Sequence, residues 1–257
     1  MADTLSYVHR FYVPANSFQD GRALLPASAA EQVRRVLRLR TGDAITIFDG
    51  SGREWLARIE AISQQAVMTR PGPESRPDAE LPTAITVCQG LVKTERFELV
   101  LQKATELGVA SIVPLVTKRV QNADAVPPSK ARLERWQRIV QEAAEQSGRV
   151  RLPEIAPAAN FQEAVASESA MGPVVILWEG GPETGLRAAL RAIVAKGVPK
   201  RMALVIGPVG GLAPEEIEGA KAIGAVVAGM GARILRSETA AIAALTATVY
   251  EFGLLGG

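Results

Sequence analysis

Cysteine and histidine are nearly absent from this sequence of 257 residues, which contains only Cys88 and His9. A single cysteine excludes an intrachain disulfide, and because no signal peptide is evident we expect a cytoplasmic protein. Cys88 lies in an apolar run and is expected in the core of a strand. A single histidine nearly excludes a Ser–His or Cys–His catalytic pair and a site built from several histidines, so we expect no metal.

Long apolar runs and a net charge of one sign are missing as well. No run is long enough to span a bilayer, so we expect no membrane partner. The 29 basic and 27 acidic residues nearly balance. Because the overall charge does not indicate a nucleic-acid partner, any basic site must come from local clustering.

One such cluster is the run RRVLRLR at 34–40, which contains four arginines and no acid. We expect a helix over 29–39, on which Arg34 and Arg38 share a face at the i,i+4 spacing with Arg35 beside them. Such a face either neutralises phosphates or is a solvated helix surface. The candidates for phosphate contact are Arg10, Arg22, Arg34, Arg35 and Arg38.

The two parts of the chain differ in their pattern. Short strands and turns predict a small β-rich domain over 1–72, and the proline-rich stretch that follows predicts a linker over 73–82. From residue 83 to 257, strands and helices alternate, which predicts an α/β domain with a parallel sheet covered by helices on both faces. Its expected strands are 85–89, 111–115, 174–178, 203–206 and 225–228, and its expected helices are 96–107, 130–147, 185–195 and a C-terminal one.

Two strand–glycine-turn–helix units stand close together near the C-terminus. The strand at 203–206 ends in Gly-Pro-Val-Gly-Gly at 207–211, and Pro214 with two acids then opens a helix. The strand at 225–228 ends in Gly-Met-Gly. Such turns form a ligand crevice at the carboxyl ends of parallel strands, where glycine lets the backbone approach the ligand. The spacing fits neither G-x-G-x-x-G nor the Walker motif, so the residues alone predict a small-molecule site or ordinary turns.

The motifs IGPVGGL and GARILRSETA, together with HRFYV, VLRLR, FDG, LQKATELGV and RWQRIVQEAAEQSGR, span most of the chain. They resemble those of the RsmE family, the ribosomal RNA (uracil-N3)-methyltransferases of the SPOUT class. The resemblance implies a PUA-like β-barrel domain that binds RNA, and an α/β domain with a deep trefoil knot that binds S-adenosylmethionine. It also implies a homodimer that acts on 16S ribosomal RNA or the assembled small ribosomal subunit.

The resemblance also implies roles for single residues. Arg236 would stabilise the anion that develops when N3 of a uracil loses its proton, and Glu238 or Glu179 would accept that proton. From the residues alone, Arg236 could instead order its loop, Ser237 and Glu238 could cap a helix, and Trp178 is expected in the core. The cofactor pocket would be lined by Leu177, Glu179, Gly207, Gly211, Met230, Gly231, Ile234 and Leu235.

One departure from the family pattern leaves an alternative open. The family usually has a glutamate in its Gly-Pro-Glu-Gly-Gly turn, and this chain has Val209. The resemblance implies methylation of N3 of a specific uridine in 16S ribosomal RNA, and the valine leaves a non-catalytic RNA-binding protein of SPOUT fold as the alternative. A nucleotide-binding oxidoreductase is a second alternative, against which the missing G-x-G-x-x-G motif argues.

Overall fold

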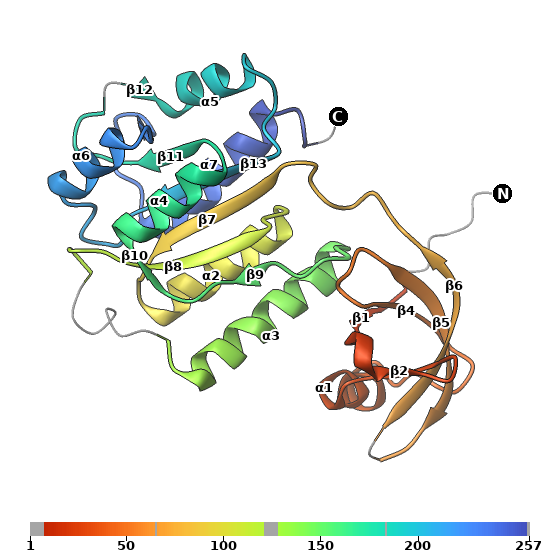
Figure 1. The fold of residues 1–257 in the computed structure, drawn as a ribbon. Coiled ribbons are helices and arrows are strands. Elements are labelled where there is room, and N and C mark those ends of the chain that lie inside the picture. Colours follow the sequence, from red (N-terminus) through yellow and green to blue (C-terminus); the bar gives the residue numbers. More distant parts are fainter. Residues whose placement is uncertain (1–7, 65, 121–127, 183, 256–257) are drawn as a thin grey trace. The chain divides into compact units, whose positions relative to one another are not determined.

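The computed structural model describes residues 8–64, 66–120, 128–182 and 184–255, and the chain divides into two compact units (Figure 1). The N-terminal unit comprises the residues up to Glu80 together with Ala144–Leu152, and the C-terminal unit comprises Leu81–Ala143 and Pro153–Gly257. The predicted contiguous division instead assigned Ala144–Leu152 to the C-terminal domain. Within the described part of the chain, every helix is too short or too polar to span a bilayer.

The N-terminal unit is built on a six-stranded sheet in the order β1-β4-β5-β6-β3-β2. All its pairings are antiparallel except that of β1 with β4. Alternate side chains such as Ile45 and Ile47 point into one apolar core, as the strand period requires. The strands are β1 Arg10–Tyr12, β2 Phe18–Gln19, β3 Arg22–Leu24, β4 Ala44–Phe48, β5 Glu54–Ile62 and β6 Val67–Ser75.

The helix predicted over 29–39 is shorter and changes its winding. An α-helical turn, α1 (Ala27–Glu31), continues as a π-helical turn, η2 (Gln32–Val36), in which the N–H of Leu37 donates to the carbonyl of Gln32 at 2.9 Å. Arg38 follows in the left-handed region with φ 52°. The prediction that Arg34 and Arg38 share a helix face is therefore wrong, because the wider turn and the helix end remove the i,i+4 relation.

The linker predicted over 73–82 is wrong in its first three residues, because β6 extends to Ser75 and pairs there with β5. Two prolines, Pro71 and Pro73, lie within this strand. β3 pairs with β6 only at Met68 and Thr69. The later part of β6 thus has one strand partner, and a proline, which has no N–H, is tolerated on an unpaired side.

The C-terminal unit confirms the predicted parallel sheet. Its strands run in the order β10-β8-β7-β13-β11-β14-β12, with β9 paired to β8, and every pairing is parallel. In Figure 1 β13 lies beside β7, toward the middle of the sheet. The strands are β7 Ala84–Gly90, β8 Ser111–Val116, β9 Glu154–Ile155, β10 Ala159–Asn160, β11 Val174–Leu177, β12 Thr184–Gly185, β13 Arg201–Ile206 and β14 Val226–Gly229.

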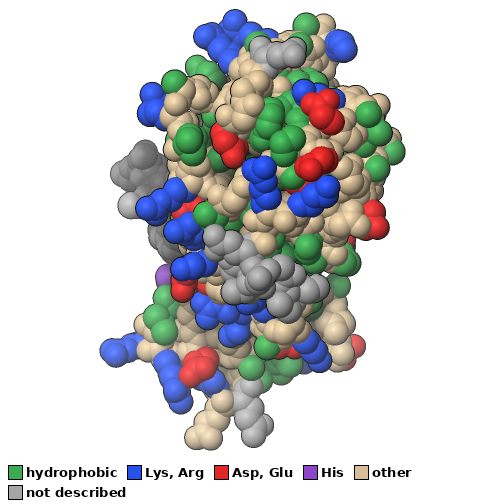
Figure 2. Space-filling model, turned by 90° about the vertical axis from the view of Figure 1, so that its left-hand side faces the viewer, with side chains coloured by type: hydrophobic (Ala, Val, Ile, Leu, Met, Phe, Trp, Pro, Cys, Tyr) green, Lys and Arg blue, Asp and Glu red, His purple; other side chains and the backbone are tan. Residues whose placement is uncertain are grey.

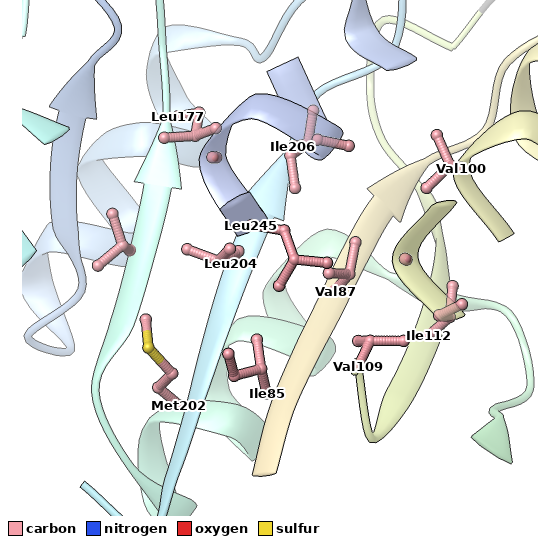
Figure 3. Packing of buried hydrophobic residues seen from close by; sticks show 14 of the residues in the cluster. Ile85, Val87, Val100, Val109, Ile112, Leu177, Met202, Leu204, Ile206 and Leu245 are labelled. Carbon is pink, nitrogen blue, oxygen red and sulfur yellow. The ribbon is translucent and has the colours of Figure 1, made fainter. Parts of the chain in front are cut away.

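Helices cover both faces of this sheet, as predicted. On one face Leu245 of α7 packs with Val87 and Leu204 of the strands (Figure 3). On the other face α4 and α6 pack against a second cluster that includes Cys88, and burial raises the pKa of that thiol. The helices are α2 Thr94–Glu106, α3 Lys130–Ser147, α4 Phe161–Met171, α5 Leu186–Val194, α6 Pro214–Ala222 and α7 Ser237–Glu251.

Candidate functional site

A cavity of about 540 Å³ opens at the carboxyl edge of the parallel sheet in the C-terminal unit. Its walls come from the loops that follow β11, β13 and β14, from the first turn of α7, and from Arg96 in α2. The chain leaves β7 toward β8 on one side and leaves β13 toward β14 on the other. Ligands bind at such a switch point in open α/β sheets, and the volume is typical of a ligand pocket.

The glycine turn after β13 needs its glycines. Gly211 has φ 70°, and a Cβ there would overlap Oε1 of Glu179. A Cβ on Gly210 would lie 2.7 Å from the carbonyl oxygen of Arg119. A Cβ on Gly90, at the end of β7, would overlap the backbone nitrogen of Pro208. The backbone of this turn is therefore packed between neighbouring loops while its other side faces the cavity.

A buried chain of hydrogen bonds ties three elements together beneath the cavity. Nε2 of the fully buried Gln89 donates to Oγ of Ser237 at 2.8 Å, and Ser237 Oγ donates to the carbonyl of Gly207 at 2.5 Å. The alternative in which Ser237 or Glu238 caps α7 is wrong, because Arg236 occupies the N-cap position and no side chain caps the helix. The ends of β7 and β13 and the start of α7 are thus held in register with one another.

Glu216, which is buried in the first turn of α6, fixes the loop after β8. Its carboxylate accepts from the backbone N–H of Ala213 at 2.8 Å and from that of Lys118 at 2.9 Å. Lys118 and the neighbouring Arg119 are exposed. This contact brings a basic loop against the glycine turn.

The structure brings the predicted cofactor residues together. All of them lie on the wall of the cavity, although they come from three different loops, and their role in binding remains a prediction. They are Leu177, Glu179, Gly207, Gly211, Met230, Gly231, Ile234 and Leu235. Trp178, which was expected in the core, is partly buried against the second cluster and also lines the cavity. Val209 is 54% exposed on the same wall.

The two residues predicted to be catalytic lie in different environments. Arg236 is exposed on the cavity wall, and its side chain has no hydrogen-bond or ion-pair partner among the described residues. Glu238 is only 7% exposed and is not among the residues that line the cavity. Nε of Arg96 lies 3.7 Å from Glu238 Oε1. Burial behind the wall does not suit Glu238 for accepting a proton directly from a ligand.

Sequence reasoning missed Arg96 and Gln89. Gln89 stands in an apolar strand, where a polar side chain is a signal of a buried hydrogen bond. Arg96 lies in the first turn of α2, where the helix dipole disfavours a cation. Both signals were present in the sequence, but neither residue could be placed beside the cavity without the fold.

Arg10 and Arg22, two predicted phosphate contacts, have acidic partners inside the N-terminal unit. Arg10 forms an ion pair with Glu54 at 2.6 Å and also donates to two backbone carbonyls. Arg22 donates to Glu60 at 2.8 Å. Hydrogen bonds from Arg22 and Arg70 hold the pKa of Glu60 below its ordinary value. These contacts give Arg10 a structural role in the unit, and its contact with a phosphate stays a prediction.

The arginines of the RRVLRLR run are only partly engaged. Arg34 donates to the carbonyl of Ser63 at 2.5 Å, and Arg35 pairs with Glu31 at 2.9 Å on an exposed surface. Arg38 is exposed and has no partner among the described residues. On the face shown in Figure 2, acidic side chains are interspersed with Lys and Arg.

Two family models match the chain. An RNA methyltransferase domain matches residues 79–249, and an RNA methyltransferase PUA domain matches residues 33–67. Ribosomal RNA small subunit methyltransferase E of Bacillus subtilis is 32% identical over 97% of this chain and 99% of its own length.

Two solved structures are similar to the chain in both sequence and fold. A methyltransferase from Legionella pneumophila, in complex with the bound cofactor SAM, is 33% identical with a TM-score of 0.82, over 95% of this chain and 97% of its own. Ribosomal RNA small subunit methyltransferase E from Neisseria gonorrhoeae, bound to S-adenosyl methionine, is 30% identical with a TM-score of 0.81, over 95% of this chain and 98% of its own.

Proposed function

The chain belongs to the ribosomal RNA small subunit methyltransferase E family, the RsmE family, and on this premise we propose that it methylates N3 of a uridine in 16S ribosomal RNA with S-adenosylmethionine as the methyl donor. One observation carries the proposal: the cavity at the sheet edge is walled by glycine turns and contains an arginine, Arg236, that the described residues leave unpaired. The oxidoreductase and non-catalytic alternatives are not favoured, because the matched relatives are methyltransferases.

The residues present fit S-adenosylmethionine. The wall combines apolar side chains, such as Leu177 and Ile206, with glycines that expose backbone amides and carbonyls. Glu179 adds a carboxylate, which suits ribose hydroxyls or an amino group. At Gly211, a side chain would fill the space that Glu179 occupies. When bound, the cofactor supplies an electrophilic methyl group on a sulfonium.

The residues of this chain would then handle charge and a proton. The uracil N3 is a poor nucleophile until its proton leaves, and the resulting negative charge spreads to the two flanking carbonyl oxygens. Arg236 is placed to donate hydrogen bonds to that charge. Glu179 is the proposed proton acceptor, because it is exposed on the cavity wall, whereas Glu238 is buried behind it. N3 lies on the pairing edge of the base, so the uridine must be unpaired when it reacts.

We propose further that the C-terminal unit contains the trefoil knot and forms a homodimer. In support of a knot, β13 lies between β7 and β11 although it follows both in the chain, so the chain passes back into the middle of the sheet. The alanine-rich helix α7 exposes Tyr250 and suits close packing against another helix. Sedimentation at equilibrium tests the dimer.

The PUA match supports RNA binding by the N-terminal unit, and the ribosomal substrate implies a cytoplasmic enzyme.

Transfer of a labelled methyl group to small ribosomal subunits tests the proposal. The subunits would come from cells that lack this modification, and the product nucleoside would be identified by mass spectrometry. We expect label in a single uridine of 16S RNA, methylated at N3. Cofactor binding by calorimetry without any transfer would instead identify a non-catalytic RNA-binding protein.

A further inference from the structure

Glu238 is a buried carboxylate with too few partners. Oε1 lies 3.7 Å from Nε of Arg96, and Oε2 is buried with no hydrogen-bond partner among the described residues. A buried carboxylate is costly unless a counter-charge compensates it. Arg96 is the only cation that forms an ion pair with Glu238 in the described part of the chain. Glu238 lies in the first turn of α7, where the positive end of the helix dipole offsets part of that cost, but Oε2 is still left without a donor.

Arg96 does not serve its own helix. It lies in the first turn of α2, where the positive end of the helix dipole repels a cation. The acid one turn away from the start of α2, Glu98, is bound by Arg135 at 2.7 Å through Nη2. The side chain of Arg96 instead faces Glu238 of α7 and reaches the wall of the cavity, where it is 34% exposed.

The position of Arg96 in the sheet separates it from most of the proposed cofactor wall. α2 follows β7, which lies on the opposite side of β13 from β11 and β14. The proposed cofactor residues follow β11, β13 and β14. Arg96 thus reaches the cavity from the remaining side, where it faces Glu238 of α7.

We propose that Arg96 binds a phosphate of the RNA strand next to the target uridine, and that Glu238 is a positioning residue that holds the Arg96 guanidinium toward the cavity. The inference rests on the proposed function. A guanidinium has five N–H donors, so Nε can face the carboxylate while the terminal nitrogens remain for a phosphodiester. In this arrangement Arg236 contacts the uracil base, and Arg96 contacts the phosphodiester backbone of the RNA beside it.

The test compares Arg96→Gln, Arg96→Lys and Glu238→Gln in the full-length enzyme. For Arg96→Gln we expect KM for small subunits to rise about tenfold while kcat stays almost unchanged. The slope of log KM against log salt concentration should fall by about one, the value that corresponds to one phosphate contact. The dissociation constant for S-adenosylmethionine should stay within about twofold, which also shows that the variant is folded. Arg96→Lys should recover part of the loss, because it keeps the charge but loses the planar fork.

A double-mutant cycle tests whether Glu238 acts through Arg96. Glu238→Gln alone should raise KM, and it should add little to Arg96→Gln, because the residue it positions is already gone. Arg187→Gln is the matched control, since Arg187 is exposed in the first turn of α5 and does not line the cavity. It should leave KM unchanged.

Two results would overturn the inference. If Arg96→Gln weakens S-adenosylmethionine by the same factor as it raises KM, Arg96 contacts the cofactor. If the salt slope is unchanged, Arg96 contacts no phosphate. Failure of the proposed function itself is separate, because it would appear as absence of methyl transfer by the unmodified enzyme.

Discussion

The arginines predicted to bind RNA in the N-terminal unit and the arginines that line the cavity of the C-terminal unit differ in their partners. In the N-terminal unit, Arg10 pairs with Glu54 and Arg22 with Glu60. On the cavity wall, Arg96 faces Glu238, but the side chains of Arg233 and Arg236 are exposed and have no partner among the described residues. The terminal nitrogens of Arg10 and the Nε of Arg22 are engaged by the protein itself, whereas Arg233 and Arg236, like Arg38 of the N-terminal unit, leave their side-chain donors for a ligand.

The difference separates charges that stabilise the fold from charges that act on a ligand. Native proteins satisfy nearly all buried polar groups, so an orphaned group calls for an explanation. Among the described residues, the buried side-chain atoms without a partner include Glu238 Oε2 and Gln89 Oε1 beside the cavity, and also Arg10 Nε, Thr117 Oγ1, Trp136 Nε1 and Ser169 Oγ elsewhere. The following predictions test whether pairing within the protein distinguishes structural from functional charge.

The largest expected effect is that of Arg236→Ala. Removing a donor that stabilises transition-state charge lowers kcat by about 10²–10³-fold. The affinity for S-adenosylmethionine, measured by calorimetry, should change little, because the proposed contact is to the substrate. Arg138→Ala on α3 removes an exposed arginine away from the cavity wall and serves as the control. If Arg236→Ala turns over at the rate of the unmodified enzyme, the absence of a side-chain partner for Arg236 does not indicate a role in catalysis.

Ser237→Ala should weaken the cofactor site without touching a charge. The change leaves the partly buried carbonyl of Gly207 without its 2.5 Å donor, which we place in the lower part of the range of about 1–3 kcal/mol for an unsatisfied buried group. We expect the dissociation constant for S-adenosylmethionine to rise about fivefold to tenfold, in line with the lower part of that range. Thr239→Ala, at an exposed position in the same turn of α7, should leave the constant unchanged.

Asp49→Asn should affect stability and not activity. Burial opposes ionisation of Asp49, yet hydrogen bonds from Ser51 and the ion pair with Arg53 hold the pKa of this carboxyl below its ordinary value. The ionised form therefore stabilises the hairpin above the unfolded-state pKa of about 3.9, and this contribution is lost as the pH falls through the lower folded-state pKa.

The expected loss for Asp49→Asn at pH 7 is about 1 kcal/mol, measured as the protection of β4 and β5 amides from hydrogen exchange. The difference from the unmodified protein should shrink in urea unfolding below about pH 3.9. A lower kcat at pH 7 with unchanged protection would contradict the structural role of this charge.

Within the N-terminal unit, Arg38→Gln should affect RNA binding more than Arg22→Gln. Arg38 is exposed without a partner among the described residues, whereas Arg22 already donates to Glu60. We expect Arg38→Gln to raise KM for small subunits about threefold and to lower the salt slope by almost one contact, with a smaller change for Arg22→Gln. If the two substitutions raise KM equally, an arginine in an exposed ion pair contributes to RNA binding as much as an unpaired one.

The sequence predicted most of the C-terminal unit because local signals decide its elements. The predicted bounds of α3, 130–147, agree with the structure, since an apolar stripe and a following glycine with φ 79° define them. The glycine turns likewise indicated the cavity edge. Helix α4 was not predicted, although Asn160 caps it by accepting from the N–H of Glu163 at 2.9 Å, a signal that was present in the sequence.

What the sequence could not give depends on contacts between distant segments. Arg96 and Glu238 stand far apart in the chain, and their pairing follows from the packing of α2 against α7. The π-helical turn before Arg38 also could not be predicted, because helix periodicity assumes 3.6 residues per turn. The site residues could be predicted from the sequence where they lie in a local turn. They could not be predicted where tertiary packing brings a charged side chain to the cavity.

The smallest effect is expected from Val209→Glu, which restores the residue that the family usually has. Val209 is 54% exposed at the cavity wall, and the carboxylate of Glu179 already lies against Gly211 of the same turn. If Glu179 supplies the negative charge that the turn requires, a second carboxylate adds only solvated charge, and kcat should change by less than about twofold. Glu179→Gln is then measured once with Val209 and once with Val209→Glu. If the loss of kcat caused by Glu179→Gln is smaller when the new glutamate is present, the two carboxylates are redundant. A rise of tenfold or more for Val209→Glu alone would mean that the valine impairs the enzyme, and that exposed charge on this wall matters even where the protein supplies another carboxylate.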